Sequence, residues 1–202
     1  GLTQDQLASS LFPLGGYTKV EIRKLAVGFG LPVASKQESQ EICFIPDQNY
    51  RRFIEEYRPG STKPGKIVDQ DGNILGEHTG ITNFTIGQRK GLGIAAGVPL
   101  FVNAIDPVRN EVVVGPAESV FTKELVASEL NWIAFNQLER EITAEAKIRY
   151  AAQPAKARLM PSGDQVKVVF DEPQRAVTTG QAVVFYQKDL VLGGGIIEKA
   201  IK

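Results

Sequence analysis

Apolar residues in the first 58 positions recur with the period of an α-helix. One stripe, with spacing i, i+3, i+4 and i+7, consists of Ile22, Leu25, Ala26 and Phe29. A second stripe with the same spacing consists of Tyr50, Phe53, Ile54 and Tyr57. Such stripes are typical of helices that pack one face against a partner. We expect the helices to end at Gly30 and at Pro59-Gly60, because glycine and proline stop helices.

Helix starts are marked by residues that can cap the backbone. Thr3 with Gln6, and Thr18 with Glu21, have the spacing of a capping box, in which two side chains satisfy backbone N–H groups of the first turn. Asp47 precedes the last helical stripe. Helices shorter than about 12 to 15 residues are marginal alone, so these segments need a partner surface.

From Lys63 onward, short β-branched runs separated by turn residues predict all-β structure. Asp71-Gly72 is a hairpin signal between residues 65–69 and 73–75. Strands this short and closely spaced are typical of barrels or sandwiches. Further strands are expected at residues 99–105, 111–115, 123–133, 141–150, 155–160, 164–170, 175–178, 181–187 and 195–199.

A polar stretch at residues 136–140 separates two β-rich halves, and we place a domain boundary near Asn136. After it, apolar and polar residues alternate from 142 to 150, which indicates a strand with one buried face and one solvated face. The alternation puts Lys147 and Arg149 on the solvated face. The fold class is therefore mainly β with an N-terminal helical segment.

Composition narrows the classes of partner. Lys and Arg together number 23, as do Asp and Glu, so a site for a polyanion must be a local patch. The single cysteine, Cys43, excludes an internal disulfide and a multi-thiolate metal site built from this chain alone. We expect no metal site. The sequence shows neither a membrane-spanning apolar run nor a signal peptide, so we expect a cytoplasmic protein without membrane contact.

Cys43 itself has two interpretations. Free cysteine is among the most buried residue types, which favours a small core residue. A nucleophile or sulfur carrier would need the thiolate form. The nearby carboxylates of Glu38 and Glu41 disfavour a thiolate, leaving Lys36 or a partner to compensate.

Two segments without carboxylates carry clustered cations. In residues 85–94, Arg89 and Lys90 lie between glycines, which suits phosphate but matches neither a Walker A loop nor a Gly-x-Gly-x-x-Gly motif. Residues 146–163 contain Lys147 and Arg149, which could contact RNA phosphates. Both segments could equally be ordinary solvated surface. His78, the only histidine, is expected to be structural because no Ser or Cys relay accompanies it.

Several segments together, in order and spacing, resemble the tRNA-specific 2-thiouridylases (the MnmA/TrmU family). They include Glu-Ser-Gln-Glu-Ile-Cys-Phe-Ile at residues 38–45 and the glycine-rich run at 84–93. The other segments are residues 2–7, 12–15, 30–34, 64–65, 78–81, 147–150 and 192–197. The resemblance covers essentially the whole chain.

This resemblance implies a three-part enzyme: an ATP-pyrophosphatase domain, a small central β-rich domain, and a C-terminal β-barrel similar to those of translation factors. Residues 1–60 would be the closing helical segment of the first domain, 61–136 the central domain, and 137–202 the barrel. The family's Ser-Gly-Gly-x-Asp-Ser phosphate loop and first catalytic cysteine are absent from this sequence. ATP is therefore expected to bind the full-length enzyme only, and this chain should bind no cofactor and be inactive alone.

The implied reaction is ATP-dependent adenylation of the C2 oxygen of the anticodon wobble uridine, followed by sulfur transfer from a cysteine persulfide. By resemblance, Cys43 is the persulfide-carrying catalytic cysteine, which overrides the burial argument. Arg149 and Tyr150 match a tRNA-contacting pair, and Gln181 matches another tRNA contact. We expect Arg89 and Lys90 to bind tRNA as well, through its phosphates. The implied partners are tRNA and a sulfur-carrier protein as persulfide donor.

The sequence departs from the family at two places. Ala151 and Ala152 follow Tyr150 where a basic or amide residue is usual, and Val191 stands where a cysteine often occurs. The alternative function is a non-catalytic RNA-binding or interaction module that shares the barrel.

Overall fold

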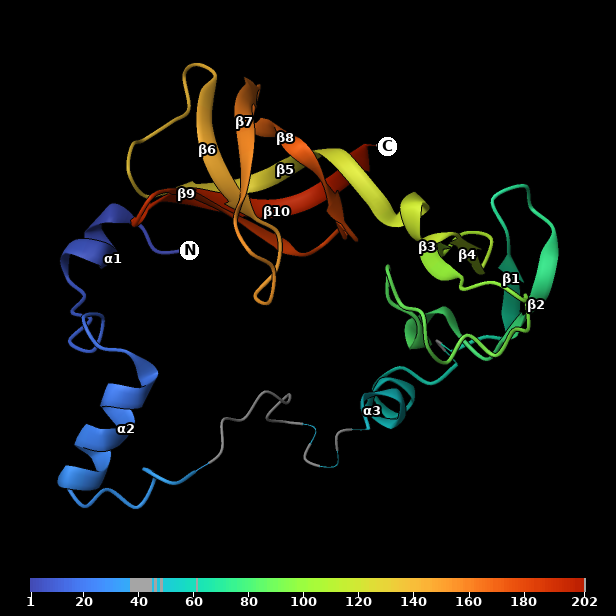
Figure 1. The fold of residues 1–202 in the computed structure, drawn as a ribbon, viewed down its shortest axis with the longest axis horizontal. Coiled ribbons are helices and arrows are strands. Elements are labelled where there is room, and N and C mark those ends of the chain that lie inside the picture. Colours follow the sequence, from blue (N-terminus) through green and yellow to red (C-terminus); the bar gives the residue numbers. More distant parts are fainter. Residues whose placement is uncertain (37–44, 46, 48, 61, 202) are drawn as a thin grey trace. The chain divides into compact units, whose positions relative to one another are not determined.

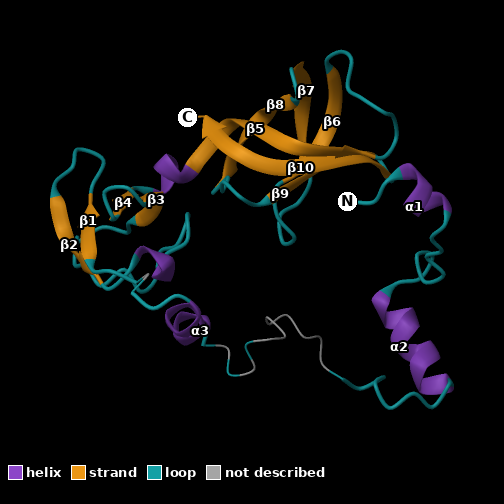
Figure 2. Cartoon of the chain, turned by 180° about the vertical axis from the view of Figure 1, so that it is seen from behind, coloured by secondary structure: helices purple, strands orange, loops and turns teal. Residues whose placement is uncertain are grey.

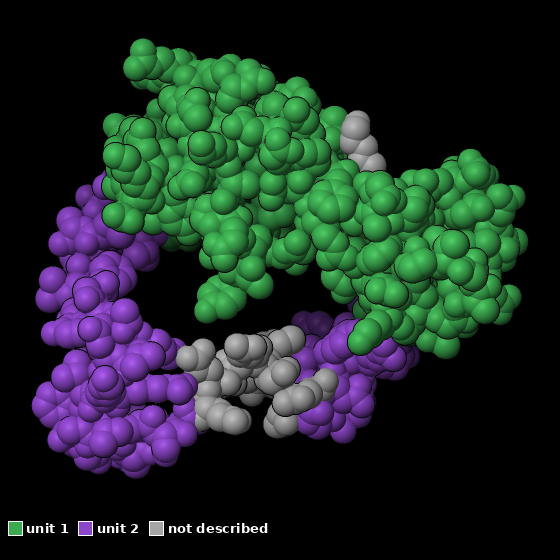
Figure 3. Space-filling model, viewed as in Figure 1, with its two compact units in different colours: residues 1, 59–202 green, residues 2–58 purple. Residues whose placement is uncertain are grey.

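The structure, a computed structural model, describes residues 1–36, 45, 47, 49–60 and 62–201. The chain divides into two compact units, coloured separately in Figure 3. Residues 2–58 form a helical unit, and Gly1 with residues 59–202 forms a β unit. The expected division between helical and β structure is thus present, and each unit is considered by itself below.

The helical unit contains α1 (Gln4–Ala8), α2 (Lys19–Gly28) and α3 (Tyr50–Tyr57). Both expected capping boxes are confirmed: the Thr3 N–H donates to Gln6 Oε1 over 2.9 Å, and the Thr18 N–H donates to Glu21 Oε2 over 2.7 Å. The bond from the Thr18 backbone, followed by that from its hydroxyl, lowers the pKa of Glu21. The cap of α3 is Asn49, whose Oδ1 accepts the Arg52 N–H.

The apolar face of α2 is only partly covered within the described part of the helical unit. Leu25 and Phe29 are 40% and 76% exposed, and Leu11 before the helix is 91% exposed. Ile45, at 5%, is the one deeply buried hydrophobic residue among the described residues of this unit. The apolar side chains of these short helices are therefore largely exposed, as expected for helices that need a partner surface.

A small sheet forms the first part of the β unit. Its strands are β1 (Gly65–Val68), β2 (Ile74–His78), β3 (Phe101–Asp106) and β4 (Glu111–Gly115), in the order β2-β1-β4-β3. The β1–β4 pair is parallel and the other pairs are antiparallel. Its core consists of Ile67, Leu92, Val102, Val112 and Val114.

The predicted Asp71-Gly72 hairpin joins β1 and β2. Gly72 has φ +86°, a conformation that side-chain-bearing residues rarely adopt. The Asp69 carboxylate accepts the N–H groups of Asp71 and Asn73 and the Asn73 side-chain amide at 2.8–2.9 Å. The Asn73 side chain is the largest cause of a lowered pKa at Asp69. The turn is therefore stabilised locally, which explains why it could be predicted.

The second part of the β unit is a closed six-stranded barrel, seen from two sides in Figures 1 and 2. Its core is continuous and includes Leu125, Leu159, Phe170, Phe185 and Ile197, each at most 1% exposed. Closure pairs every strand on both sides and so removes free edges. In the order around the barrel, the strands are β10 (Leu190–Ile201), β5 (Phe121–Trp132), β8 (Gln165–Arg175), β7 (Ala155–Ser162), β6 (Ile142–Lys147) and β9 (Ala182–Gln187).

Several details differ from the sequence expectations. Strand β5 precedes the boundary expected near Asn136, yet it pairs with β8 and β10 and belongs to the barrel. The separate strand expected at residues 175–178 does not form, because β8 continues to Arg175 and a turn follows. Strand β10 begins at Leu190 and not at residue 195.

Candidate nucleic-acid interface

The candidate site begins at the end of strand β6, where buried and solvated residues alternate as predicted. Ala144, Ala146 and Ile148 are 6%, 1% and 3% exposed, so Lys147 and Arg149 face outward. The alternation fails at Tyr150, which is 91% exposed. The strand has ended at Lys147, and a turn closed by the Ala152 N–H on the Arg149 carbonyl releases the ring into solvent.

The neighbouring strand β9 supplies the other side of the site, because Lys147 is in register with Val184 and Glu145 with Tyr186. Gln181 immediately precedes β9 and is exposed. Its backbone is fixed at both ends: its N–H donates to the Thr178 carbonyl over 3.3 Å, and its carbonyl accepts the Ile197 N–H over 2.8 Å. These two bonds therefore hold the backbone of Gln181 in place beside the start of β9.

Together these elements form an open pocket of about 650 Å³, which we call the barrel pocket. It is lined by Lys147, Arg149, Tyr150, Ala151, Gln181, Ala182, Val184 and Tyr186. The structure thus brings together Arg149, Tyr150 and Gln181, three of the residues expected to contact tRNA. Ala151, one of the departures from the family pattern, lines the same pocket and contributes no polar group.

The barrel pocket has a cationic and aromatic lining with no carboxylate. The Lys147 ammonium lies 5.7 Å from the centroid of the Tyr150 ring, a cation–π geometry. The Arg149 guanidinium donates from Nη2 to the Arg175 carbonyl over 2.9 Å, which orients it and leaves its other donors available. Such a lining suits a ligand that combines negative charge with flat aromatic groups.

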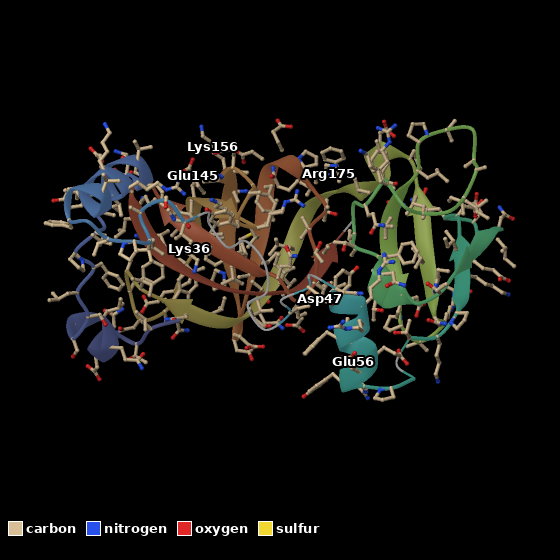
Figure 4. All side chains as sticks on the ribbon, turned by 90° about the horizontal axis from the view of Figure 1, so that it is seen from below. Lys36, Asp47, Glu56, Glu145, Lys156 and Arg175 are labelled. Carbon is tan, nitrogen blue, oxygen red and sulfur yellow. The ribbon has the colours of Figure 1, made fainter. Side chains whose placement is uncertain are left out.

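The other cations of the carboxylate-free segment are arranged differently. Arg158 pairs with Glu141 at 3.3 Å, and both side chains are about half exposed. Lys156 is opposite Glu145 in the β6–β7 register, and both are labelled in Figure 4. These two cations therefore face carboxylates, and neither lines the barrel pocket.

Arg89 and Lys90 lie outside the barrel pocket, in the glycine-rich loop of residues 85–94. Both are exposed. The loop is held by Gln88, whose side chain accepts the Thr85 N–H over 3.0 Å and donates to the Lys90 carbonyl over 2.9 Å. Two backbone bonds also tie it to Val102. The cations are thus displayed on an ordered loop.

Arg175 connects this loop to the barrel and has no sequence signal that could have revealed it. Its Nη2 donates to the Gly87 carbonyl over 2.9 Å, and its guanidinium lies 5.5 Å from the centroid of the Phe101 ring. Its own carbonyl accepts the bond from Arg149. The contacts join residues 88 and 26 positions apart, beyond the reach of any local pattern.

Cys43 and its neighbours at residues 37–44 lie outside the described residues, so its role stays a prediction. His78 is described, and it is buried at 4% exposure. Its Nε2 lies 3.2 Å from the Asn110 carbonyl, and its ring meets Phe84 edge-on at 5.5 Å between centroids. These contacts support the structural role expected for His78.

Within the residues that the structure covers, no group of three or more His, Cys, Asp or Glu residues could hold a metal ion. No helix in the same part of the chain is long and apolar enough to cross a membrane.

Three family models match successive parts of the chain. The tRNA methyl transferase HUP domain matches residues 1–47, the tRNA methyl transferase PRC-barrel domain residues 51–116, and the aminomethyltransferase beta-barrel domain residues 122–197. The last match begins beside the start of β5 at Phe121, in agreement with the barrel seen in the structure.

Curated relatives extend the comparison over nearly the whole chain. A protein named tRNA-specific 2-thiouridylase MnmA from Clostridium botulinum (strain Alaska E43 / Type E3) is 56% identical over 98% of this chain and 55% of its own length. The relative of that name from Halothermothrix orenii is 52% identical over 98% of the chain and 56% of its own length. Caldanaerobacter subterraneus subsp. tengcongensis has a relative named tRNA-specific 2-thiouridylase MnmA 1, 55% identical over 100% of the chain. The chain spans about half the length of these relatives, and it belongs to the family of the tRNA-specific 2-thiouridylases.

Proposed function

We propose that this chain is the tRNA-binding and persulfide-carrying part of an enzyme that converts the wobble uridine of tRNA to 2-thiouridine. The observation that carries the proposal is the barrel pocket, where Arg149, Tyr150 and Gln181 meet in a lining without carboxylates. The relatives' name, tRNA-specific 2-thiouridylase, supports tRNA as the substrate and 2-thiouridine as the product.

Each side chain of the pocket has a chemistry that suits RNA. Arg149 and Lys147 line the pocket with positive charge. Cations can neutralise phosphates, and such contacts fix the position of a nucleic acid but read no sequence. Tyr150 presents an almost fully exposed ring on which an unpaired base can stack. Gln181 offers an amide that can donate to and accept from a base edge or a sugar. The combination favours single-stranded RNA, such as an anticodon loop.

For the sulfur chemistry, we assign Cys43 the role of persulfide carrier. The terminal sulfur of the persulfide would attack C2 of a uridine whose oxygen has been adenylated, and AMP would leave with that oxygen, which gives a Cys43–S–S–C2 disulfide. The thiolate of the family's first catalytic cysteine, in the part of the enzyme that this chain does not span, would then attack the Cys43 sulfur, so that the S–S bond breaks, 2-thiouridine leaves with the terminal sulfur and a protein disulfide forms. An external dithiol would reduce that disulfide, and a sulfur-carrier protein would transfer a new persulfide sulfur to Cys43. The nucleophilic form of such a group is anionic, so a cationic neighbour would assist it.

We infer that ATP binds outside the described residues of this chain. The glycine-rich loop is the one candidate for a phosphate cradle, but the N–H groups of Gly87 and Gln88 already donate to the Val102 and Thr85 carbonyls. A phosphate loop needs free N–H groups that point at the ligand. We therefore expect ATP activation to occur in the part of the full-length enzyme that this chain does not span.

Stacking on Tyr150 provides the test of the proposed function. Tyr150→Ala in the full-length protein should weaken binding of unmodified tRNA by about 1–3 kcal/mol, the usual value of one base–aromatic stack. Tyr150→Phe keeps the ring and should bind almost normally. Filter binding with a transcript carrying wobble uridine measures both. Equal binding by the Ala and Phe variants would contradict a stacking role.

A second assay, which measures sulfur transfer to the same transcript, separates the enzyme from a non-catalytic RNA-binding module. Transfer of ³⁵S to the wobble uridine by the full-length protein is expected only for the enzyme. Binding without transfer, in the presence of ATP and a persulfide donor, would favour the module.

A further inference from the structure

Arg175, the last residue of β8, joins the two cationic elements of the β unit. Its guanidinium reaches the glycine-rich loop through the Gly87 carbonyl at 2.9 Å and lies against the Phe101 ring. Its carbonyl, on the other side, accepts the guanidinium of Arg149 at 2.9 Å. Figure 4 labels Arg175 among the side chains between the barrel and the small sheet. One residue therefore contacts both the barrel pocket and the loop that displays Arg89 and Lys90.

The close approach of the loop depends on a glycine. A Cβ added to Gly87 would lie 2.7 Å from the Ala176 Cβ, nearer than such atoms can come. Gly87 also has φ +84°, which disfavours other residues independently of space. Ala176 in turn is 3% exposed and is fixed by its N–H bond to the Val120 carbonyl over 2.8 Å. The loop therefore packs at Gly87 against Ala176, a buried residue whose backbone is hydrogen-bonded.

We propose that Arg175 is a positioning residue that holds the glycine-rich loop and the barrel pocket at a fixed separation, so that both bind one tRNA together. The inference rests on the proposed function, since it requires that both elements contact tRNA. Once one element is bound, a fixed separation makes binding by the second intramolecular, which raises affinity without any new contact. A loop released from Arg175 would lose this advantage.

The proposal predicts that the effect of Arg175 on tRNA affinity depends on Arg89 and Lys90. Arg175→Lys keeps the charge but loses the planar fork that bonds Gly87 and lies against Phe101. In the full-length protein, it should weaken binding of an unmodified wobble-uridine tRNA transcript by about tenfold, within the range for residues coupled in one hydrogen-bond network. In an Arg89→Ala/Lys90→Ala background, the loop has no cations left to position, so the same substitution should change affinity by less than about twofold.

Gly87→Ala provides a second variant that removes no charge. It should lift the loop from Ala176 and lower affinity as Arg175→Lys does. The matched control is Gly97→Ala, because Gly97 has a similar φ of +68° but no atom within 4 Å of an added Cβ. The control should bind tRNA normally, which separates docking of the loop from backbone strain.

The outcomes distinguish the two proposals. Unchanged affinity in Arg175→Lys would overturn the positioning role and point to a direct phosphate contact that lysine can replace. An equal loss in both backgrounds would also overturn it, since general destabilisation does not depend on Arg89 and Lys90. Failure of the unsubstituted full-length protein to bind the transcript would instead overturn the proposed function, and the inference with it.

Discussion

At the scale of single residues, the barrel pocket combines side chains that act on RNA in different ways. Arg149 is oriented by the Arg175 carbonyl, while Tyr150 stands almost free in solvent beside the Lys147 ammonium. An oriented cation loses little conformational entropy on binding a phosphate. An exposed ring loses more conformational entropy on binding, but it gains the stacking energy of a base. Arg149 is therefore suited to fix the register of the RNA, and Tyr150 to hold one of its bases.

The role of Cys43 is tested most directly by Cys43→Ser in the full-length protein. A serine hydroxyl is close in size to a thiol but cannot hold persulfide sulfur, so transfer of ³⁵S to tRNA should fall to background. Binding of tRNA should stay within about twofold, because the pocket side chains are unchanged. Near-normal sulfur transfer by the variant would disprove the carrier role.

At the scale of elements, the β1–β2 hairpin shows how a turn is stabilised by one carboxylate. The pKa of Asp69 lies below its ordinary value, first because of the Asn73 side-chain amide and then because of the Asn73 backbone N–H. Since the folded pKa is lowered, the contribution to stability is present above the ordinary pKa of 3.8 and is lost as the pH falls through the lowered value.

Asn73→Ala should raise the pKa of Asp69 towards its ordinary value, because it removes the largest of these causes. NMR titration of the Asp69 carboxyl carbon would measure the change. Asn83→Ala is the matched control, since Asn83 bonds Thr79 and not Asp69. An Asp69 titration that is the same in Asn73→Ala and in the unsubstituted chain would refute this account of the turn.

The elements that could be predicted from the sequence are those fixed by neighbours along the chain. Thr3, Thr18 and Asp69 each bond residues within four positions, so the helix starts and the hairpin follow from local spacing. Strand β5 was separated from the barrel in the prediction, because the polar residues 136–140 resemble a linker. In the structure they form a connection within the barrel, between β5 and β6.

The candidate site was predictable only in part, for the same physical reason. The alternation of apolar and polar residues predicted that Arg149 faces solvent. It could not show that the strand ends before Tyr150. The contact of Arg175 with Gly87 spans 88 positions and depends on barrel closure. Family resemblance supplied Gln181, whose position beside Arg149 no periodicity indicates.

At the scale of the whole molecule, net charge gives no attraction to RNA, because 23 cationic and 23 acidic side chains balance. Affinity must then come from local patches, and such patches leave a measurable signature. Each neutralised phosphate contributes about −0.7 to −0.9 to the slope of log K against log salt. A protein that uses few cations should therefore show a shallow slope that individual substitutions change visibly.

We expect Arg89→Ala/Arg149→Ala in the full-length protein to flatten that slope by roughly 1.5, because two phosphate contacts are lost. Gln181→Ala should weaken tRNA binding with little change of slope, since an uncharged amide releases no counterion. The matched control is Arg109→Ala/Arg158→Ala, which removes the same charge from arginines that already pair with Asp106 and Glu141. If both double variants change the slope equally, the effect is one of total charge and the local patches have no special role.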